Sequence, residues 1–337
     1  MNSSEQNRLP FALRLTALLI AFFSGFAAPF AAAGTGAMKT ATLMPLWTPQ
    51  AQFAGYYVAQ EKGIYARHGI QLQLLKAGPG YSPTAALERG EADFAVLWLT
   101  TALQHRAAGM AVTNLSQTIQ HSSLMLVARK NSGIRSIEDM QDKKIGLWGG
   151  DLSLPVYALF SLRDIRFREI RQSQTVNLFL RGGVDVASAM WYNEYHTMLN
   201  SGLNEDELTL FFLDQEGMRF PEDGIYAMQQ TLERDPALAA AFVKASMEGW
   251  QYAFDHPEEA LDIVIRRMRE ARLPANRVHQ RWMLKRMQDL MQPQNHKNSA
   301  GRLDKADFDK VQSTMKRMGQ ILHPVRHEDF TWVPDGH

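Results

Sequence analysis

The chain has 337 residues, of which 45% are hydrophobic and 21% charged, with a formal net charge of +1 at pH 7 and no cysteine. So small a net charge gives no electrostatic case for nucleic-acid binding, which depends on Lys and Arg neutralising phosphates. Without cysteine the chain has no disulfide bonds, so an exported form must be stabilised by a large core. The length is enough for two domains of ordinary size.

The N-terminus has the pattern of a secretory signal peptide. Arg8 and Arg14 precede an apolar run from Leu15 to Phe26, and the small-residue stretch APFAAAG follows that run. A basic start, a short hydrophobic core and an A-x-A site near Ala33 predict a signal peptide over residues 1–33. The alternative is a membrane anchor, but the apolar core is shorter than the roughly 20 residues that span a bilayer. No cysteine is present to carry a lipid anchor, so we expect release into the periplasm.

Short strand-like runs alternate with helical ones from Thr40 to about Phe220. The expected strands are TATLMPLW (40–47), IQLQLL (70–75), ADFAVL (92–97), LMLVAR (124–129), KKIGLW (143–148), VDVASAM (184–190) and LTLFFL (208–213). Residues 50–69 and 99–108 have helical spacing, and Ser82 with Pro83 forms a natural N-cap and first-turn pair. This alternation predicts α/β layers with largely parallel sheets.

From Gly224 onward the pattern becomes helical. IYAMQQ (225–230) can form one last strand, and Asp235-Pro236 and His256-Pro257 each mark the start of a helix. Apolar stripes continue through residues 238–249, 261–268 and 303–318, interrupted by a polar loop over 293–301. A chain that is α/β first and helical last fits a two-lobed body whose C-terminal helices brace the first lobe.

One long segment carries a family resemblance. WTPQAQFAGYYVAQEKGIYARHGIQLQLLKAGPG (47–80) resembles the opening of solute-binding proteins related to the thiamine-pyrimidine synthase family. EADFAVL (91–97), residues 125–150, AMWYNEYHTMLNSGLNEDEL (189–208) and FPEDGIYA (220–227) resemble further segments of that family in the same order. The resemblance covers most of residues 40–230.

The resemblance implies a periplasmic binding protein-like type II fold, with two α/β lobes, a hinge and C-terminal helices packed on lobe 1. Such proteins close around a ligand by hinge motion. The crossings would lie near residues 123–127 and 219–224, with lobe 1 formed by 38–124 plus 223–337 and lobe 2 by 125–222. The family implies a monomer that passes a pyrimidine, flavin, sulfonate or other small molecule to an ABC permease at the inner membrane.

Four of the seven tryptophans follow predicted strands, where ligands of open α/β sheets bind. They are Trp47, Trp98, Trp148 and Trp191, two in each predicted lobe. A cleft with aromatic faces from both lobes would clamp a planar ring, because aromatic side chains offer large area and stacking geometry. The alternative is that these tryptophans cap the core at strand ends.

Polar candidates lie beside these tryptophans. Glu194 follows Trp191 by about one helical turn, and its carboxylate can pair with the ring nitrogen and exocyclic amine of a protonated aminopyrimidine. The alternative is a solvated glutamate at a helix start. Tyr192 adjoins it, and Tyr56 can reach the cleft from the other lobe.

A second polar candidate is GGDLS (149–153), in which Gly149 to Ser153 open a helix and expose backbone N–H groups to an anion. Glycine pairs also form ordinary turns. Ser122 lies just before the first crossing, where hinge and ligand contacts coincide.

Other chemistries lack their motifs. The chain has no H-E-x-x-H, G-x-S-x-G or Walker-type loop, and its ten histidines show no metal-ligand spacing. The related synthases carry a cysteine-rich segment used with iron, which this chain lacks. We therefore expect no catalytic residues, no metal and no cofactor. The leading hypothesis is an ABC-linked binding protein for a thiamine-precursor aminopyrimidine or a similar planar heterocycle. The alternatives are a binding protein for riboflavin or a sulfonate, a periplasmic sensor for a signalling receptor and, less favoured, a pyrimidine synthase.

Overall fold

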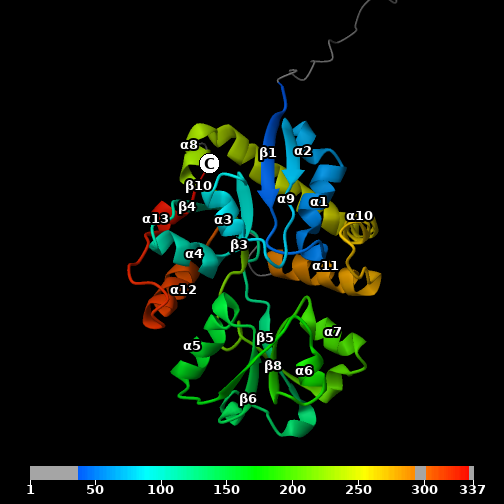
Figure 1. Cartoon of the computed structure of the whole chain (residues 1–337), viewed down its shortest axis with the longest axis vertical. Coiled ribbons are helices and arrows are strands. Elements are labelled where there is room, and N and C mark those ends of the chain that lie inside the picture. Colours follow the sequence, from blue (N-terminus) through cyan, green and yellow to red (C-terminus); the bar gives the residue numbers. More distant parts are fainter. Residues whose placement is uncertain (1–36, 293–300, 334–337) are drawn as a thin grey trace, which may run out of the picture. The chain divides into compact units, whose positions relative to one another are not determined.

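Two five-stranded sheets organise the part of the chain that the computed structural model describes, residues 37–292 and 301–333 (Figure 1). The first sheet contains β1 (Lys39–Met44), β2 (Ile70–Leu74), β3 (Phe94–Trp98), β4 (Val112–Gln117) and β10 (Asp223–Met228). The second contains β5 (Leu124–Arg129), β6 (Lys144–Leu147), β7 (Arg168–Arg171), β8 (Val186–Met190) and β9 (Leu208–Phe212). The predicted α/β class is confirmed. The predicted signal peptide, residues 1–33, lies outside the described residues.

Each sheet has one strand that runs against its neighbours. The strand orders are β2-β1-β3-β10-β4 and β7-β6-β8-β5-β9. β10 is antiparallel to both β3 and β4, and β5 is antiparallel to both β8 and β9, whereas the other pairings are parallel. These are the strands that the chain enters when it passes from one sheet to the other, between β4 and β5 and between β9 and β10. The sheets are therefore mixed, and the two passages lie beside each other.

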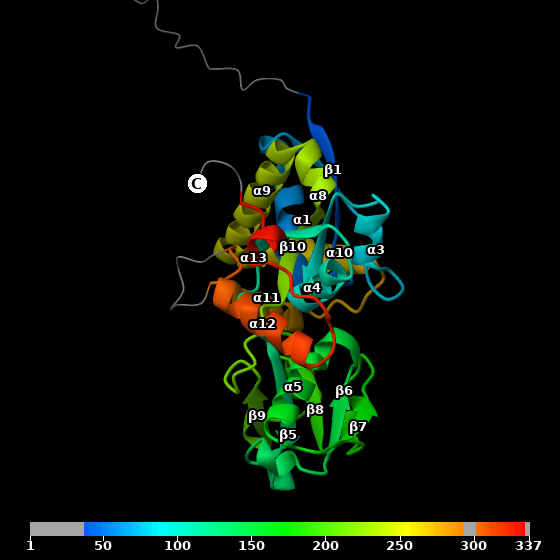
Figure 2. The ribbon, with the colours of Figure 1, turned by 90° about the vertical axis from the view of Figure 1, so that its left-hand side faces the viewer.

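Helices cover both sheets, and those of the C-terminal part lie with the first sheet in the upper half of Figures 1 and 2. They are α8 (Gln229–Arg234), α9 (Pro236–Asp255), α10 (Pro257–Glu270), α11 (Arg277–Met291), α12 (Lys305–Arg317) and α13 (His327–Phe330). The first sheet also has η1 (Ala51–Phe53), α1 (Ala54–Glu61), α2 (Ile64–Arg67), α3 (Pro83–Glu88) and α4 (Leu99–Ala107), and the second has η4 (Gly150–Leu152), α5 (Leu154–Leu162), α6 (Asn177–Leu180) and α7 (Glu194–Asn200). No helix in this part of the chain is both long and apolar enough to cross a membrane.

Close packing of α1 against α9 fixes the core behind the first sheet. A Cβ added to Gly249 would collide with the Gly55 carbonyl, and one added to Gly55 would collide with the Trp250 ring. Only glycine permits this approach of the two helices. Phe94 of β3 and Phe242 of α9 stack with ring centroids 4.0 Å apart, which ties the sheet to the same helix.

The predicted helix starts are confirmed. Ser82 caps α3 by accepting a hydrogen bond from the Ala85 N–H, with Pro83 in the first turn, and Asp235 caps α9 by accepting from Leu238. The helical pattern over 50–69 is divided into η1, α1 and α2. Gly63 has φ +65°, a left-handed conformation that ends α1 and that glycine adopts without strain.

Candidate functional site

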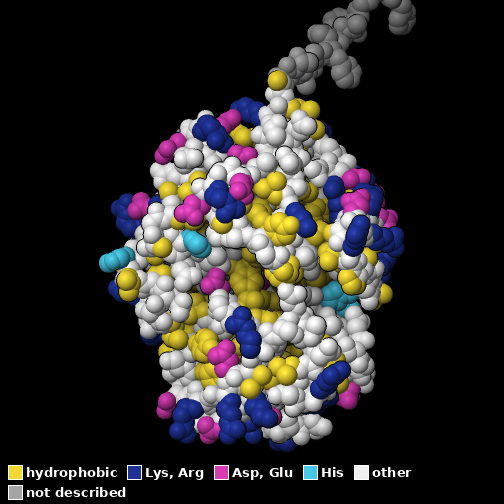
Figure 3. Space-filling model, viewed as in Figure 1, with side chains coloured by type: hydrophobic (Ala, Val, Ile, Leu, Met, Phe, Trp, Pro, Cys, Tyr) yellow, Lys and Arg dark blue, Asp and Glu magenta, His cyan; other side chains and the backbone are white. Residues whose placement is uncertain are grey.

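A small cavity lies between the two sheets. Its volume is about 30 Å³. Residues of both sheets and both passages line it: Trp98, Thr100, Ser122, Leu124, Asp151, Leu152, Pro155, Met190, Phe220, Pro221 and Glu222. Figure 3 shows a hollow at mid-height of the molecule with hydrophobic side chains in it. Thr101 of α4 donates a hydrogen bond to Asp151 of η4, so contacts between elements of the two sheets narrow the space. The cavity has room for little more than a water molecule, and a ligand requires the sheets to separate.

Asp223, the first residue of β10, carries a buried acceptor without a partner. It pairs across the strands with Trp98 and is 3% exposed. Its Oδ2 accepts a hydrogen bond of 2.8 Å from Gln52 Nε2, while Oδ1 has no partner among the described residues. Burial raises the pKa of the Asp223 carboxyl, and the Gln52 amide and the Trp98 indole oppose that rise, although Trp98 Nε1–H has no hydrogen bond of good geometry within the described ranges. Each unsatisfied buried group costs about 1–3 kcal/mol, which a ligand could recover.

Glutamine and tyrosine side chains surround Asp223. Gln50 Nε2 donates to Gln52 Oε1 at 2.6 Å, which orients the Gln52 amide toward the aspartate. Tyr56 of α1 is 1% exposed and packs edge-on against Trp250, with ring centroids 5.8 Å apart. Burial, and then the Asp223 charge, raises the pKa of Tyr56, which places this side chain in the same electrostatic environment. The donors around Asp223 are therefore neutral.

Glu222 joins the two passages between the sheets. Its Oε1 accepts from the Ser123 N–H at 2.6 Å and from the Ser122 hydroxyl at 3.3 Å, and its Oε2 accepts from the Ser123 hydroxyl at 2.8 Å. Glu222 is 7% exposed and also lines the cavity. One carboxyl thus positions the hinge segments and contributes to the wall of the cavity.

Glu194 is held by the turn that follows β8. Its Oε2 accepts from the Met190 N–H at 3.1 Å, and its Oε1 accepts from Asn193 Nδ2 at 2.8 Å. Part of the residue remains in contact with solvent although its carboxyl is enclosed. Tyr192 is buried, and the charges of Asp223, Glu222 and Glu194 add to burial in raising its pKa. Tyr192 therefore lies within electrostatic reach of all three carboxyls.

The three carboxyls have raised pKa values. Burial raises the pKa of Glu194 and of Asp223 to about 7 each, and that of Glu222 to about 8, with the Asp223 charge as a further cause for Glu222. No Lys or Arg contributes to these shifts. Burying a carboxylate without a cation favours its neutral form. The arrangement is poised to accept a ligand that supplies hydrogen-bond donors or positive charge.

The predicted tryptophans have different surroundings. Trp98 lines the cavity, whereas Trp47, Trp148 and Trp191 are outside its lining. Trp47 is half-buried against the core after β1, and Trp148 Nε1 donates to the Ser173 carbonyl at 3.0 Å. The Trp191 ring lies 4.5 Å from the Arg286 guanidinium and edge-on to Phe212 at 5.8 Å.

In the loop from Gly149 to Ser153, the serine hydroxyl is bonded within the loop and Asp151 accepts from Thr101. Ser153 is 2% exposed, and its hydroxyl donates to the Gly150 carbonyl at 2.8 Å. Gly149 has φ +81°, and a Cβ there would collide with the Arg171 guanidinium. Asp151 and Leu152 of the same loop line the cavity, but Gly149 and Ser153 do not. Of the predicted set, Trp98 and Ser122 line the cavity, whereas Gly149, Ser153, Tyr56, Tyr192 and Glu194 do not. Tyr56 and Tyr192 are connected to the site by the carboxyl charges that raise their pKa values.

Three site residues were missed by reasoning from the sequence: Gln52, Glu222 and Asp223. The segment FPEDGIYA was recognised as a family feature and as a crossing, but its two acidic residues were not singled out. Two adjacent carboxylates before an apolar strand, at a predicted crossing, were the available signal. Gln52 offered none, because a glutamine in a helical pattern is ordinary surface chemistry.

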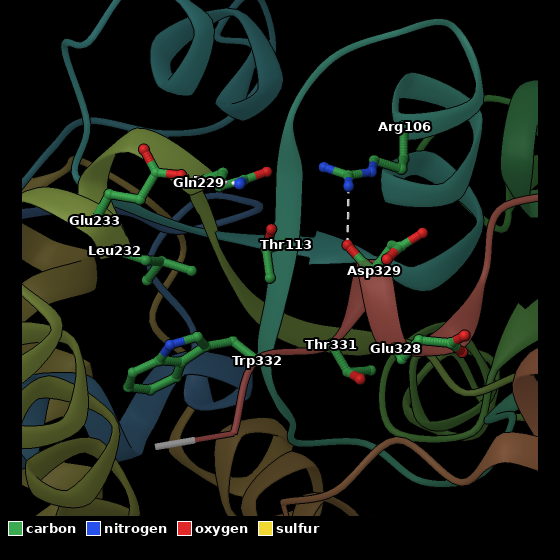
Figure 4. A pocket seen from close by; sticks show the side chains of 9 residues that line it. All are labelled: Arg106, Thr113, Gln229, Leu232, Glu233, Glu328, Asp329, Thr331 and Trp332. Atoms are coloured by element: carbon green, nitrogen blue, oxygen red, sulfur yellow. Dashed lines mark hydrogen bonds between the residues drawn. The ribbon is translucent and has the colours of Figure 1, made fainter. Parts of the chain in front are cut away.

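A wider cavity lies elsewhere on the first-sheet side. It has a volume of about 360 Å³ and is lined by residues from α4, β4, α8, α13 and the following segment (Figure 4). Its polar groups are largely paired: Arg106 donates to the Asp329 carbonyl at 2.9 Å, and Gln229 donates to Glu233 at 2.9 Å. The cavity has acidic and basic walls but no buried unpartnered polar side chain in its described lining. The described residues also contain no group of three His, Cys, Asp or Glu that could hold a metal ion.

Comparison with known proteins gives a family match over most of the two-sheet region. Residues 50–260 match the family model described as NMT1/THI5 like. The Riboflavin-binding protein RibY of Chloroflexus aurantiacus is 28% identical over 266 residues, which cover 73% of this chain and 72% of RibY. The 4-amino-5-hydroxymethyl-2-methylpyrimidine phosphate synthase of Legionella pneumophila is 24% identical over 248 residues, covering 69% of this chain and 75% of the synthase.

Solved structures show the fold. The periplasmic aliphatic sulphonate binding protein SsuA from Escherichia coli superposes with a TM-score of 0.68 at 14% identity, covering 88% of this chain and 92% of SsuA. The predicted periplasmic binding protein-like fold is confirmed by this similarity. At that identity the likeness concerns fold alone, so the ligand must be inferred from the site.

Proposed function

The chain belongs to the NMT1/THI5-like family, and from that premise we propose that it is an extracytoplasmic solute-binding protein of an ABC importer. Its proposed ligand is a small planar heterocycle such as a thiamine-precursor aminopyrimidine. The observation that carries this proposal is the buried Asp223 Oδ1, which has no hydrogen bond of good geometry in the described structure and whose partner across the strands, Trp98, has an Nε1–H that also lacks one.

An aminopyrimidine offers the complementary groups. Its exocyclic amine donates to a carboxyl oxygen, and its ring nitrogen either accepts from an N–H or, once protonated, donates as well. Asp223 with Trp98 provides an acceptor and a donor on neighbouring strands, and Glu194 provides a second carboxyl from the other sheet. A cationic ring would let these carboxyls ionise inside the site, because an opposite charge favours the carboxylate.

Aromatic side chains supply the remaining area. Trp98 lines the cavity, and Tyr56 and Tyr192 share the electrostatic environment of Asp223 from the two sides of the site. A planar ring between such side chains gains stacking and excludes water from the carboxyls. We propose that Tyr192, Trp98 and Tyr56 form the walls and that Ser122 acts through Glu222 to set the hinge.

Opening and closing would move two lobes. We keep as a proposal the division into lobe 1, residues 38–124 plus 223–337, and lobe 2, residues 125–222. The passages at Ser122 to Leu124 and at Glu222 to Asp223 would be the hinge, with Glu222 as the common anchor of both. The protein would act as a monomer in the periplasm after removal of residues 1–33, and it would deliver its ligand to an ABC permease at the inner membrane.

Other binding roles share this fold. A riboflavin-binding role is favoured by the name of one relative, and a sulfonate-binding role would follow only if the ligand were an anion. A sensor that presents its ligand to a signalling receptor uses the same cleft. Permease and ATPase genes beside this gene favour import, whereas a kinase gene alone favours sensing.

A pyrimidine synthase is the one enzymatic candidate, because a relative carries that name. It requires a lysine or histidine to hold pyridoxal phosphate and, in the resemblance described above, cysteines used with iron. The described lining of the inter-sheet cavity offers neither lysine nor histidine, and the sequence has no cysteine. The residues present do not fit these groups, and we derive no reaction through them. Product formation from pyridoxal phosphate and iron would overturn this assignment.

The proposal is tested by a thermal-shift screen of residues 34–337 against aminopyrimidines, riboflavin, alkanesulfonates and amino acids. A ligand that binds the native state raises the melting temperature by mass action. We expect a shift with 4-amino-5-hydroxymethyl-2-methylpyrimidine and none with alkanesulfonates. A shift only with sulfonates would reject the heterocycle and move attention to the loop from Gly149 to Ser153.

A further inference from the structure

Helix α11 carries two different stripes. Its apolar residues, Met283, Leu284, Met287, Leu290 and Met291, are buried, and Gln280 Oε1 accepts a hydrogen bond of 2.7 Å from the Ala51 N–H of η1. This stripe fixes the helix to the first-sheet side. The residues His279, Trp282 and Arg286 are spaced by three and four positions, so they lie along another side of the same helix. All three contact the segment Trp191–His196, which follows β8 of the second sheet.

The contacts of this second stripe are specific. Trp282 Nε1 donates to the Trp191 carbonyl at 2.9 Å, and the Arg286 guanidinium lies 4.5 Å from the Trp191 ring and 4.7 Å from the Trp282 ring. The His196 ring stacks on Trp282 with centroids 4.8 Å apart and an interplanar angle of 21°. Figure 1 shows α11 and α7 facing each other where the first-sheet and second-sheet halves meet. Helix α11 of the first-sheet side thus contacts the backbone and the aromatic rings of the segment that follows β8 in the second sheet.

Two histidines meet across this contact. His279 Nδ1 lies 3.0 Å from His196 Nδ1, and His279 Nε2 lies 2.9 Å from Asn193 Oδ1. If neutral His279 donates from Nε2 to the amide oxygen, its Nδ1 has only a lone pair, and His196 must supply the proton between the rings. The Asn200 amide nitrogen, Nδ2, lies 3.0 Å from the same His196 Nδ1. Because an NH2 group cannot accept from a protonated nitrogen, this proton arrangement requires the Asn200 amide to be turned so that its oxygen faces His196. Both rings are then neutral.

The histidine pair is connected to the candidate ligand carboxyl. Asn193 Oδ1 accepts a hydrogen bond from His279 Nε2–H, and Asn193 Nδ2 donates to Glu194 Oε1 at 2.8 Å. A continuous series of hydrogen bonds therefore runs from His196 through His279 and Asn193 to Glu194. The side chain that would bind the ligand takes its orientation from a helix on the other side of the cavity.

We propose that His279, Trp282 and Arg286 form a clasp on the segment Trp191–His196 that holds the two sheets closed and positions Glu194, and that protonation of the histidine pair releases it. This inference rests on the proposed function only for the role of Glu194. The clasp itself requires no ligand. His279 is a positioning residue here, since it acts on Glu194 through Asn193.

The chemistry of release follows from the short contact between the rings. A proton added at His279 Nδ1 makes that ring an imidazolium, places its N–H against the His196 N–H at 3.0 Å and removes the only acceptor between the rings. Burial, followed by the His196 charge, lowers the pKa of His279 to about 4, and burial also lowers the pKa of His196. Histidines exposed by opening would titrate near the ordinary value of 6.5. The closed form therefore loses stability as pH falls from about 6.5 towards 4.

Other titratable groups surround the two histidines, and one of them, Glu194, favours the closed form in acid. The groups on α11, α10 and the facing segment are Arg277, Arg281, Arg286, Asp289, Glu258, Asp262, Glu194 and Tyr195. The basic members are paired with acidic ones: Arg277 and Arg281 with Glu258, and Arg286 with Asp289. Burial raises the pKa of Glu194 to about 7, so its protonation favours closure in acid. A matched variant must therefore isolate the histidine contribution.

The first test measures closure without ligand. Because the chain has no cysteine, Glu88→Cys and Arg135→Cys introduce two exposed label sites, one on each side. We expect the distance between two labels, measured by energy transfer, to increase between pH 7 and pH 5. His279→Gln keeps a donor in place of Nε2–H and removes the titrating ring, so its label distance should not increase between pH 7 and pH 5, where protonation of Glu194 favours closure. His323→Gln, at an exposed position, is the control and should behave as the parent.

The second test measures ligand affinity with 4-amino-5-hydroxymethyl-2-methylpyrimidine over the same pH range. The dissociation constant of the parent should rise by roughly tenfold more between pH 7 and pH 5 than that of His279→Gln. Equal label distances and equal pH profiles in parent and variant would overturn the clasp. A pH-dependent label distance without binding of this probe would support the clasp and reject the proposed ligand, so the two failures are distinguishable.

Discussion

Two polar regions each contribute residues to the lining of the cavity between the sheets, Trp98 in one and Asp151 in the other, and their side chains are hydrogen-bonded differently. At Asp223 and Trp98, one acceptor and one donor lack full hydrogen-bond partners among the described residues. At the loop from Gly149 to Ser153, the serine hydroxyl is bonded to Gly150 and the first glycine is covered by Arg171. The loop follows β6 and was predicted as a candidate site, whereas Asp223 opens β10 and was not singled out from the sequence. Of the two, only the first, at Asp223 and Trp98, has buried side-chain atoms without a hydrogen-bond partner among the described residues.

The two regions also differ in the charge of the ligand that each could bind. Asp223, Glu222 and Glu194 are buried with neutral donors, so an anion would meet further negative charge. An anion would be expected instead at exposed backbone N–H groups, as at a helix start. The comparison therefore separates heterocycle binding from sulfonate binding, and substitutions in the two regions should have effects of very different size.

The largest effect is expected for Asp223→Asn. The variant replaces the buried carboxyl by a neutral amide, and we expect aminopyrimidine binding to weaken by about 3 kcal/mol because a charge-assisted hydrogen bond is lost. Calorimetric titration measures the change. Asp164→Asn is the matched control, since Asp164 is exposed and its φ of 53° is tolerated by asparagine. Unchanged affinity in Asp223→Asn would place the ligand elsewhere.

A smaller effect is expected for Trp191→Ala. The ring contacts Arg286 and Phe212 at the edge of the site, so its loss should weaken binding by about 2 kcal/mol through looser closure and lost aromatic area. Fluorescence titration with the remaining tryptophans gives the affinity. The far-ultraviolet circular dichroism spectrum should stay unchanged, and its collapse would show that Trp191 is a core residue.

The third prediction concerns how the stability of the fold changes with pH in the absence of ligand. The folded-state pKa values of Asp223 and Glu222 are raised to about 7 and 8 from ordinary values of 3.8 and 4.5. A raised carboxyl pKa stabilises the fold below the ordinary value and loses that contribution as pH rises through the folded-state value. We expect Glu222→Gln to flatten the decrease in stability between pH 6 and pH 8 by about 1 kcal/mol. Thermal unfolding across this range checks the slope, and identical slopes in parent and variant would contradict the assigned burial.

The smallest effect is expected for Ser153→Ala. The hydroxyl is already bonded to the Gly150 carbonyl, so its removal should change ligand affinity by less than about 0.5 kcal/mol. A large loss of binding, measured by the same titration, would mean that the loop opens to receive the ligand. The two polar regions would then have exchanged roles.

The fold followed from local chemistry. Strand periodicity, the Ser82 and Asp235 caps and the changed pattern after Gly224 specify elements by interactions between neighbours in sequence. The reversal of β5 and β10 did not follow, because strand direction is set by which sheet the chain enters. The long helix over 50–69 was divided because Gly63 takes a left-handed conformation that sequence periodicity does not reveal.

The site was only partly predictable for a similar reason. Trp98 and Glu194 could be placed at strand ends, where loops collect. The pairing of Asp223 with Trp98 and the stripe of His279, Trp282 and Arg286 depend on contacts between residues more than 80 positions apart. No local pattern marks such pairs, so Trp191 looked like a ligand residue although the structure gives its ring Arg286 as a neighbour.

The most direct test is a crystal structure of residues 34–337 with 4-amino-5-hydroxymethyl-2-methylpyrimidine at neutral pH. The account predicts a planar ring between the sheets, with its amine or ring nitrogen within hydrogen-bonding distance of Asp223 Oδ1 and its faces against Trp98 or Tyr192. A ring bound at the Gly149–Ser153 loop, or in the wider cavity beside Trp332, would contradict it.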